Sequence, residues 1–313
     1  MKGLHYGQEY LCVPFEDFQP LFHLYFVADE VVLKEITTEH LFVGYHPLLL
    51  ALPVPFDTHS DKSLFLNFTS QPFSMGNTLK QKDTVARIEL KMITDIPVPS
   101  PGYRFYRAIH AMHRFVPAFN RWIQSKANHL FNRRPGNIFL EGNLLEQVQV
   151  AYSYPRIISL ISLKHATGFN LFPTDLHGQI GDTYVVSLRT GGKAAEQVER
   201  SKFLAISEVN THHGKHVYEL GKNHMQDPKS FKEFSFSQRT SQVLQIPLPE
   251  GAVSYRELQL TDSFRYGIHC VMLFIILNRE ILESGIHRLA HVHTSYATWR
   301  HRNGMVNNII DRQ

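Results

Sequence analysis

The first third of the chain consists of short apolar runs separated by turn residues. These runs are rich in β-branched and aromatic residues, which favour strands. They cover residues 10–15, 24–36, 40–52, 63–69 and 85–93. Prolines at positions 97, 99 and 101 then exclude a helix interior and a central strand. The pattern predicts a β-rich N-terminal domain over residues 1–100 that ends in a linker or a sheet edge.

The strongest helical periodicity follows between residues 105 and 130. Apolar residues recur there at three- and four-residue steps: Phe105, Ile109, Met112, Val116, Phe119, Ile123, Ala127 and Leu130. The opposite face would carry Arg107, Arg114, Arg121, Lys126, Arg133 and Arg134. Pro117 is expected to kink the helix or to split it. The spacing predicts a basic amphipathic helix that connects two domains across residues 101–142.

From residue 144 the pattern returns to strands separated by tight loops. Strands are expected at residues 144–154, 156–164, 183–189, 203–209, 241–246, 254–261, 270–280 and 291–299, with one helix at 192–200. We find no internal sequence repeat and no low-complexity tract. The sequence therefore predicts a mainly β protein of the α+β type, with a C-terminal domain over residues 143–313.

Composition agrees with two globular domains. The 313 residues exceed the roughly 250 to 300 at which a single core stops growing. Hydrophobic residues make up 43% and charged residues 19%, which argues against disorder. Cys12 and Cys270 predict no disulfide framework, because Cys270 lies in an apolar run typical of a buried thiol. Residues 1–7 lack a signal-peptide pattern and no apolar run is long enough to span a membrane, so a cytoplasmic protein is expected.

The segment 184–193 runs from a β-branched strand through a glycine pair towards a helix. The first turn of a helix has unpaired backbone N–H groups and the positive end of the helix dipole, so a phosphate is stabilised there. Ser187, Arg189 and Lys193 add a hydroxyl and two positive charges. The alternative is an ordinary turn, since glycine pairs are common between strand and helix.

The preceding segment, residues 168–178, reads as a loop rich in short polar side chains. A flat heteroaromatic ring needs backbone donors along its edge and an apolar wall against its face. Phe172 offers such a wall, while Asn170 and Thr174 offer polar groups. The alternative is an irregular surface loop in which residues 173–175 form a turn.

Residues 144–304 resemble the flavin reductase-like family, whose members are split β-barrels that bind flavin mononucleotide (FMN) and usually form homodimers. The similar features follow in order: a loop at 170–174, a strand at 185–189, a helix and outgoing strand at 193–206, Gly-Ile-His at 267–269, and a closing Arg-Gly turn within 296–304. Residues 177–182 depart from the small residues and prolines usual in the family. The first 140 residues do not resemble it.

The resemblance implies an FMN-binding split β-barrel behind the β-rich domain and the connecting helix. It implies FMN, or alternatively FAD, as cofactor, with NAD(P)H bound only transiently, since no Gly-x-Gly-x-x-Gly fingerprint is present. The implied cofactor-binding residues are Asn170, Phe172, Pro173, Thr174, Asp175, Ser187, Arg189, Thr190, Gly191, Gly192 and Lys193. His269 is expected on the substrate side, although a histidine at this position is also a common structural residue.

Two functions follow from the resemblance. The first is an NAD(P)H-dependent flavin oxidoreductase, which needs no protein nucleophile because hydride passes between the stacked nicotinamide and flavin. No catalytic residue is predicted. The second is a non-catalytic flavin-binding or structural protein whose site is covered by the N-terminal domain. Expected partners are flavin, nicotinamide and a second copy of the chain, without nucleic acid or membrane.

Competing signals are less specific. His212, His213 and His216 cluster in the sequence, and His291 and His293 would share one face of a strand. Without a neighbouring carboxylate or cysteine pattern, no metal site is predicted. The basic helix face could meet nucleic acid or an acidic membrane, but its regular apolar side favours a packed helix with a solvated face. No Gly-x-Ser-x-Gly motif indicates a hydrolase.

Overall fold

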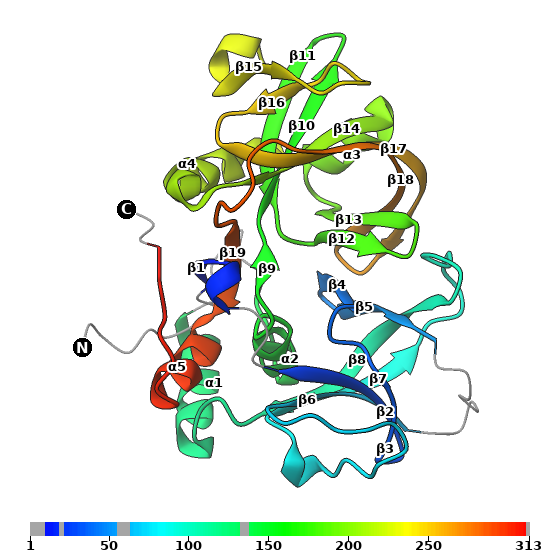
Figure 1. Cartoon of the computed structure of the whole chain (residues 1–313), viewed down its shortest axis with the longest axis vertical. Coiled ribbons are helices and arrows are strands. Elements are labelled where there is room, and N and C mark those ends of the chain that lie inside the picture. Colours follow the sequence, from blue (N-terminus) through cyan, green and yellow to red (C-terminus); the bar gives the residue numbers. More distant parts are fainter. Residues whose placement is uncertain (1–9, 19–21, 55–62, 132–137, 311–313) are drawn as a thin grey trace.

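Two seven-stranded antiparallel sheets dominate the fold, one from each half of the chain (Figure 1). The computed structural model describes residues 10–18, 22–54, 63–131 and 138–310. The N-terminal sheet contains β2 (His23–Ala28), β3 (Val31–Glu35), β4 (Leu41–Tyr45), β5 (Leu48–Pro53), β6 (Leu64–Thr69), β7 (Ala86–Met92) and β8 (Tyr103–His113). The C-terminal sheet contains β10 (Ser159–His165), β11 (Gly168–Thr174), β12 (His177–Ile180), β13 (Thr183–Arg189), β14 (Phe203–Val209), β17 (Ala252–Tyr266) and β18 (His269–Ile281).

The remaining elements connect or cover these sheets. Three short strands form a separate sheet in the order β1 (Tyr10–Pro14), β19 (Leu289–His293), β9 (Arg156–Ile157), and β15 (Phe236–Thr240) pairs with β16 (Pro247–Pro249). The α-helices are α1 (Ala118–Phe131), α2 (Asn143–Ala151), α3 (Lys193–Ser201), α4 (Gly214–Glu219) and α5 (Thr294–Arg302). The 3-10 helices are η1 (Glu16–Phe18), η2 (Gln81–Asp83), η3 (Thr211–His213), η4 (Leu220–Met225) and η5 (Phe231–Glu233).

The two large sheets have the same topology. The N-terminal order is β3-β2-β6-β7-β8-β5-β4, and the C-terminal order is β11-β10-β14-β17-β18-β13-β12. If the strands of each sheet are numbered along the chain, both orders read 2-1-5-6-7-4-3. The chain therefore contains one strand arrangement twice, although its sequence shows no repeat.

The C-terminal sheet curls so that its two edge strands come close together. In the C-terminal half β11 and β12 lie at opposite edges, yet only Asp175 and Leu176 separate them in the chain. So short a connection spans at most about 3.6 Å per residue, which a flat seven-stranded sheet would exceed. The inner face of this curled sheet is apolar and is covered by Ala194, Ala195 and Val198 of α3.

Helix α2 covers the inner face of the N-terminal sheet in a comparable way. Leu145 and Val148 pack there with Phe26, Leu50 and Tyr106. The helix follows β8 rather than lying between β5 and β6, so the two halves close their cores with helices from different points in the chain. Residues 143–151, expected in the C-terminal domain, thus pack on the N-terminal sheet.

Equivalent strands of the two sheets pack against each other through a seam of buried apolar residues. The N-terminal half contributes Val43, Leu49, Ala51 and Phe105 from β4, β5 and β8. The C-terminal half contributes Ile180, Val185, Val271 and Leu273 from β12, β13 and β18. These strands occupy the same places in the two topologies, so the seam is the internal analogue of a two-fold interface between like subunits.

The prediction of a connecting helix across residues 101–142 is partly wrong. Residues 103–113 form β8, which lies between β7 and β5 inside the N-terminal sheet, and α1 begins only at Ala118. Phe105 and Tyr106 lie on opposite faces of β8 and are both buried, whereas Arg107, Ile109 and His110 are exposed, so the two-residue alternation is lost. A register shift at Glu89/Leu90 of the neighbouring β7 disturbs the pattern further. Pro117 precedes the first turn, where proline is tolerated, and kinks nothing. Arg133 and Arg134 lie outside the described residues.

Other boundaries also differ from the predictions. Residues 144–154 are mainly helix α2 rather than a strand, the expected loop at 168–178 is largely β11 and β12, and residues 241–246 are a turn. The expected strand at 291–299 changes after His293 into α5, where the His293 ring accepts a hydrogen bond from Ser295 N–H as a helix N-cap. The predicted helix at 192–200 is confirmed as α3, and Cys270 is buried as predicted.

Candidate functional site

The predicted phosphate segment has the expected strand, glycine pair and helix. Arg189 ends β13, and Gly192 is the N-cap of α3, which has no side-chain cap. Arg189 is exposed and has no carboxylate partner among the residues described here. Lys193 instead pairs with Asp227 at 2.5 Å on the surface. Arg189 is thus the uncompensated cation at this helix start.

Helix η4 covers one side of the glycine pair. A side chain at Gly192 would lie 3.2 Å from the carbonyl oxygen of His224 and 3.5 Å from Met225 Sδ. Nearby, Gln197 Nε2 donates to the carbonyl of Gln226 at 2.7 Å. Any anion at the start of α3 therefore has to approach from the side of Arg189 and the exposed Gly191.

The residues expected to face a flavin ring mostly point into the sheet interior. Asn170 is 1% exposed and its Nδ2 donates to Gln197 Oε1 at 2.7 Å, while Phe172 is fully buried in the core. Pro173 accepts a hydrogen bond from His224 Nε2 at 2.7 Å through its carbonyl. Thr174 Oγ1 accepts one from Leu176 N–H at 3.4 Å. Asn170 and Phe172 have no surface left for a ligand, because β11 is a strand whose alternate side chains face inward.

Ser187 and His269 meet the N-terminal half at the seam. His269 is 1% exposed; its Nε2 accepts from Tyr45 N–H and its Nδ1–H donates to Ser187 Oγ, both at 3.2 Å. The Tyr45 ring also packs edge-on against the imidazole, with centroids 4.8 Å apart. Burial lowers the pKa of His269 to about 4, helped by Arg189. The substrate-side role expected of His269 has no exposed surface, and the residue links the two halves.

Asp175 lies in a buried polar cluster between the edge strands. Its Oδ2 accepts hydrogen bonds from His291 Nδ1 at 2.8 Å and from the Tyr152 hydroxyl at 3.0 Å. Arg156 Nε donates to the Asp175 carbonyl at 3.1 Å. Burial raises the pKa of Asp175, but His291 and Arg156 outweigh it and lower the pKa to about 2. Burial lowers the pKa of His291, but the Asp175 carboxylate outweighs it and raises the pKa.

A cavity of about 310 Å³ opens beside this cluster, where β4 of the N-terminal half faces β12. Its apolar wall residues come from both halves and include Phe15, Leu41, Phe42, Tyr154 and Ile157. Its charged or polar lining residues include Arg156, Asp175, His177, Glu208, Arg256 and Arg288. Of the predicted site residues, Asp175 alone lines this cavity.

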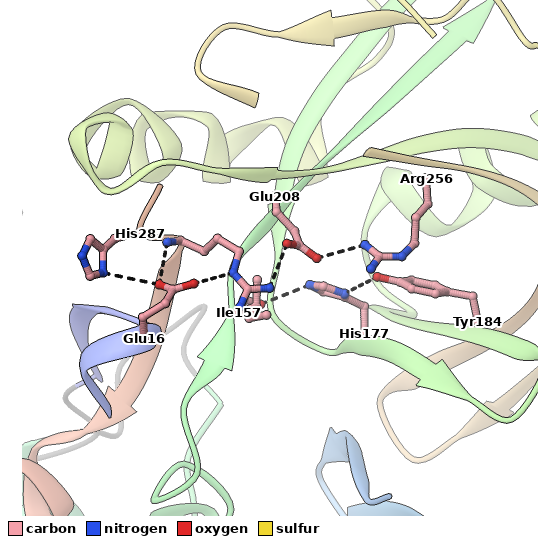
Figure 2. Close-up of polar contacts among 8 residues, drawn as sticks. Glu16, Ile157, His177, Tyr184, Glu208, Arg256 and His287 are labelled. Carbon is pink, nitrogen blue, oxygen red and sulfur yellow. Dashed lines mark hydrogen bonds and ion pairs between the residues drawn. The ribbon is translucent and has the colours of Figure 1, made fainter. Parts of the chain in front are cut away.

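Glu208 lines the cavity and joins two arginines that line it too (Figure 2). Its carboxylate accepts from Arg256 Nη1 at 2.9 Å and from Arg288 Nη1 at 3.2 Å. Arg288 Nε also donates to Glu16 at 2.6 Å. Burial raises the pKa of Glu208, but the two guanidinium groups outweigh it and lower the pKa. The carboxylate is therefore ionised and compensated at neutral pH.

His177 and Tyr184 also line the cavity and contact each other (Figure 2). His177 Nε2–H donates to the Ile157 carbonyl at 3.1 Å, so Nδ1 accepts from the Tyr184 hydroxyl at 2.8 Å. Burial lowers the pKa of His177 to about 4. The imidazole is thus neutral and held in one tautomer.

The sequence contains a signal for these polar lining residues, although they form no motif. Glu208 lies two and four residues from Ile206 and Leu204, so its side chain is expected on the same face of β14 as these core residues. Arg256 lies two residues from the core residue Leu258 and is expected on the same face of β17. Charged residues at inward-facing positions of a strand need a partner, because an unpaired buried charge is costly. Complementary charges on β14 and β17 therefore indicate a polar site inside the sheet.

We predict that His177 and His269 stay neutral down to about pH 5. Their folded pKa values lie below the ordinary value of about 6.5, so their contribution to folding is present above that pH and is lost as the pH falls through about 4. Histidine ring resonances in an NMR titration should show no midpoint above about pH 5 for either residue. A midpoint near the ordinary value would contradict the buried arrangement.

No group of three or more His, Cys, Asp or Glu side chains in the described part of the chain converges as a metal site. Within the same residues, no helix has the length and apolar character needed to cross a membrane.

Neither the models of known protein families nor the curated proteins match this chain. Solved structures resemble part of it. The NADH:FAD oxidoreductase of Streptomyces globisporus is 11% identical with a TM-score of 0.41, over 46% of this chain and 86% of that one. The styrene monooxygenase flavin reductase of Pseudomonas putida is 15% identical with a TM-score of 0.38, over 45% and 90%. An FMN-binding protein of Thermus thermophilus is 16% identical with a TM-score of 0.35, over 42% and 73%.

Proposed function

We propose that this chain is an FMN-binding protein and an NAD(P)H-dependent flavin oxidoreductase. The observation that carries the proposal is Arg189, an exposed cation without a carboxylate partner in the described residues, placed before a glycine pair and the start of α3. A phosphate there would meet a guanidinium group, unpaired backbone N–H groups and the helix dipole together. The sequence resemblance supports the same assignment.

The proposed phosphate site consists of Arg189, Thr190, Gly191, Gly192 and Lys193. A flavin bound there would accept hydride from a nicotinamide stacked on its ring. The protein would supply the anion site and a rigid seam between the halves, held by His269 between Ser187 and Tyr45. FMN fits the proposal better than FAD in that its phosphate is a terminal monoester, whose free oxygens a guanidinium group such as that of Arg189 can bind in bidentate fashion.

The alternative function is a flavin-binding or structural protein without turnover. The enclosed position of His269 favours it, because Tyr45 of the N-terminal half covers the place expected for a substrate. NADH or NADPH oxidation by the purified chain with added FMN separates the two functions. Sedimentation in the same buffer tests the proposed homodimer. A monomer is the alternative outcome, because the internal seam already joins two equivalent sheets within one chain.

We expect Arg189→Ala to weaken FMN binding by roughly ten- to a hundredfold, which is the effect of losing one charged hydrogen-bonding group. Flavin fluorescence quenching measures the affinity, and absorbance at the flavin bands reports cofactor retained by the purified chain. Arg239→Ala is the matched control, because Arg239 is exposed on β15 of the same half. A colourless protein that binds no added FMN, and an Arg189→Ala variant indistinguishable from the parent, would refute the proposal.

A further inference from the structure

Helix α1 presents large apolar side chains to solvent. Phe119, Trp122 and Leu130 are 68%, 58% and 70% exposed, and the Phe119 and Trp122 rings stack with their centroids 6.1 Å apart. Steps of three and four residues from Phe119 through Trp122 and Lys126 to Leu130 place these side chains on one face of the helix. This exposed face extends over about 16 Å, since a helix rises about 1.5 Å per residue. It lies at the periphery of the molecule, beside α5 (Figure 1).

The side of α1 that faces the rest of the protein is largely polar. Asn128 is 3% exposed, and its Nδ2 donates to a backbone carbonyl beyond the helix at 2.9 Å. Gln124 Oε1 accepts from Gln149 of α2 at 3.4 Å. The apolar residues on this side are the half-buried Ile123 and the buried Ala127. A surface helix normally has the reverse arrangement, so the exposed face of α1 is suited to contact with an apolar surface.

The surroundings of this face are basic. Residues 96–140 contain six arginines and one lysine and neither Asp nor Glu, although the whole chain has a net charge of only +4. Lys126 lies within the exposed face, and the exposed Arg114 and Arg302 line a depression with Ala118 at the start of α1. In the described part of the chain, none of these three cations forms an ion pair. The face is therefore complementary to an apolar surface that carries negative charge.

We propose that α1 docks the protein on an anionic lipid membrane, with Phe119, Trp122 and Leu130 at the boundary between head groups and acyl chains. Phe, Trp and Leu together with basic residues are the composition of helices that lie in the membrane interface. Lys126 reaches the head groups with its ammonium group while its methylene stem stays against the apolar face. Each exposed cation near an anionic leaflet adds to the attraction.

Other occupants fit this face less well. A second copy would bring like faces together and place Lys126 near its own copy, without a carboxylate on α1 to compensate it. A small molecule needs a concave site, whereas a helix face is convex. A nucleic acid would use the cations and the two rings but would leave Leu130 in water. The sequence predicted no membrane partner because the apolar side of the helix was expected to pack, and the exposure of Phe119 and Leu130 removes that reason.

The test is sedimentation of the full chain with lipid vesicles. The probes are vesicles of phosphatidylcholine alone and vesicles of phosphatidylcholine and phosphatidylserine in equal parts. We expect partitioning into the mixed vesicles to be roughly tenfold or more stronger, and this preference to disappear at high salt. Trp122 is one of two tryptophans, so the emission should shift to the blue on binding. Absence of binding to the mixed vesicles, or equal binding to both kinds, overturns the proposal.

Variants assign the binding to α1. Phe119→Ser and Trp122→Ser are each expected to weaken vesicle binding by roughly tenfold, because each loses a side chain that the membrane would bury. Ile281→Ser is the matched control, since Ile281 is 75% exposed on β18 of the other half. Lys126→Glu should weaken binding to the mixed vesicles by roughly tenfold or more, with Lys215→Glu on α4 as its control. Binding that survives Trp122→Ser unchanged refutes the assignment to this helix.

The remaining outcomes separate the other occupants. A dimer that Phe119→Ser dissociates, without vesicle binding by the parent chain, overturns the proposal in favour of a second copy. Binding of a single-stranded oligonucleotide that Trp122→Ser abolishes, again without vesicle binding, overturns it in favour of a nucleic acid. Arg189→Ala should leave vesicle binding unchanged, because Arg189 lies in the other half of the chain. The membrane proposal and the flavin proposal can therefore fail separately.

Discussion

Asp175→Ala should lower the free energy of unfolding by about 3–5 kcal/mol, because it removes one partner from a buried charged cluster. The carboxylate accepts from His291 and Tyr152, and it is the compensating charge beside Arg156, which is 7% exposed. Without Asp175, the Arg156 guanidinium remains buried with only carbonyl acceptors. Chemical denaturation followed by circular dichroism measures the loss.

The pH dependence of this effect has a defined sign. The folded pKa of Asp175, about 2, lies below the ordinary value of about 3.9, so its stabilisation is present above about pH 4 and is lost as the pH falls through about 2. The difference between parent and variant should therefore shrink in acid. Asp227→Ala is the control, since its surface pair with Lys193 contributes about 0–1 kcal/mol. Equal losses for both variants would show that the cluster does not stabilise the fold.

Phe105→Ala should destabilise the seam between the two halves by about 3–5 kcal/mol, the usual cost of truncating a buried phenylalanine. Phe105 is 1% exposed and meets Phe264 edge-on, with ring centroids 5.3 Å apart. The cavity would open between apolar residues of both sheets. Thermal unfolding measured by calorimetry reports the change in stability.

The same experiment tests whether the seam couples the halves. In the parent we expect one cooperative transition, and in Phe105→Ala an earlier and broader one, because the sheets lose shared buried area. Phe119→Ala is the matched control; Phe119 is 68% exposed on α1, so its truncation should change stability by less than about 0.5 kcal/mol. A Phe105→Ala variant as stable as this control would mean that the halves do not depend on the seam.

The spacing of apolar residues predicted most strands and the helix after the glycine pair. In these elements apolar residues recur at the two-residue or the three- to four-residue step that places them on one buried face. It failed at β8, where Phe105 faces the seam and Tyr106 faces the N-terminal core, so alternation disappears. It failed again at α2, whose apolar residues also suit a strand. The shared topology of the halves could not be predicted, since strand order depends on which edges meet and not on local composition.

The candidate site was predictable in part. The segment from Arg189 to Lys193 lies where the strand-to-helix pattern placed it. Asn170 and Phe172 were expected to face a ligand, but a loop prediction cannot tell which side of an edge strand a residue takes. Glu208 and Arg256 gave no motif, because their pairing depends on the register that sets Ile206 opposite Arg256.

The short sheet of β1, β19 and β9 bears on how the chain folds during synthesis. Tyr10 of β1 pairs with His293 of β19, a sequence separation of 293 − 10 = 283 residues. In this sheet β1 therefore has no partner until residues 289–293 have been made. Contacts this distant in sequence slow folding and leave strand edges exposed to other chains. During translation, β1 is thus an unpaired strand that other chains can reach until β19 has been made.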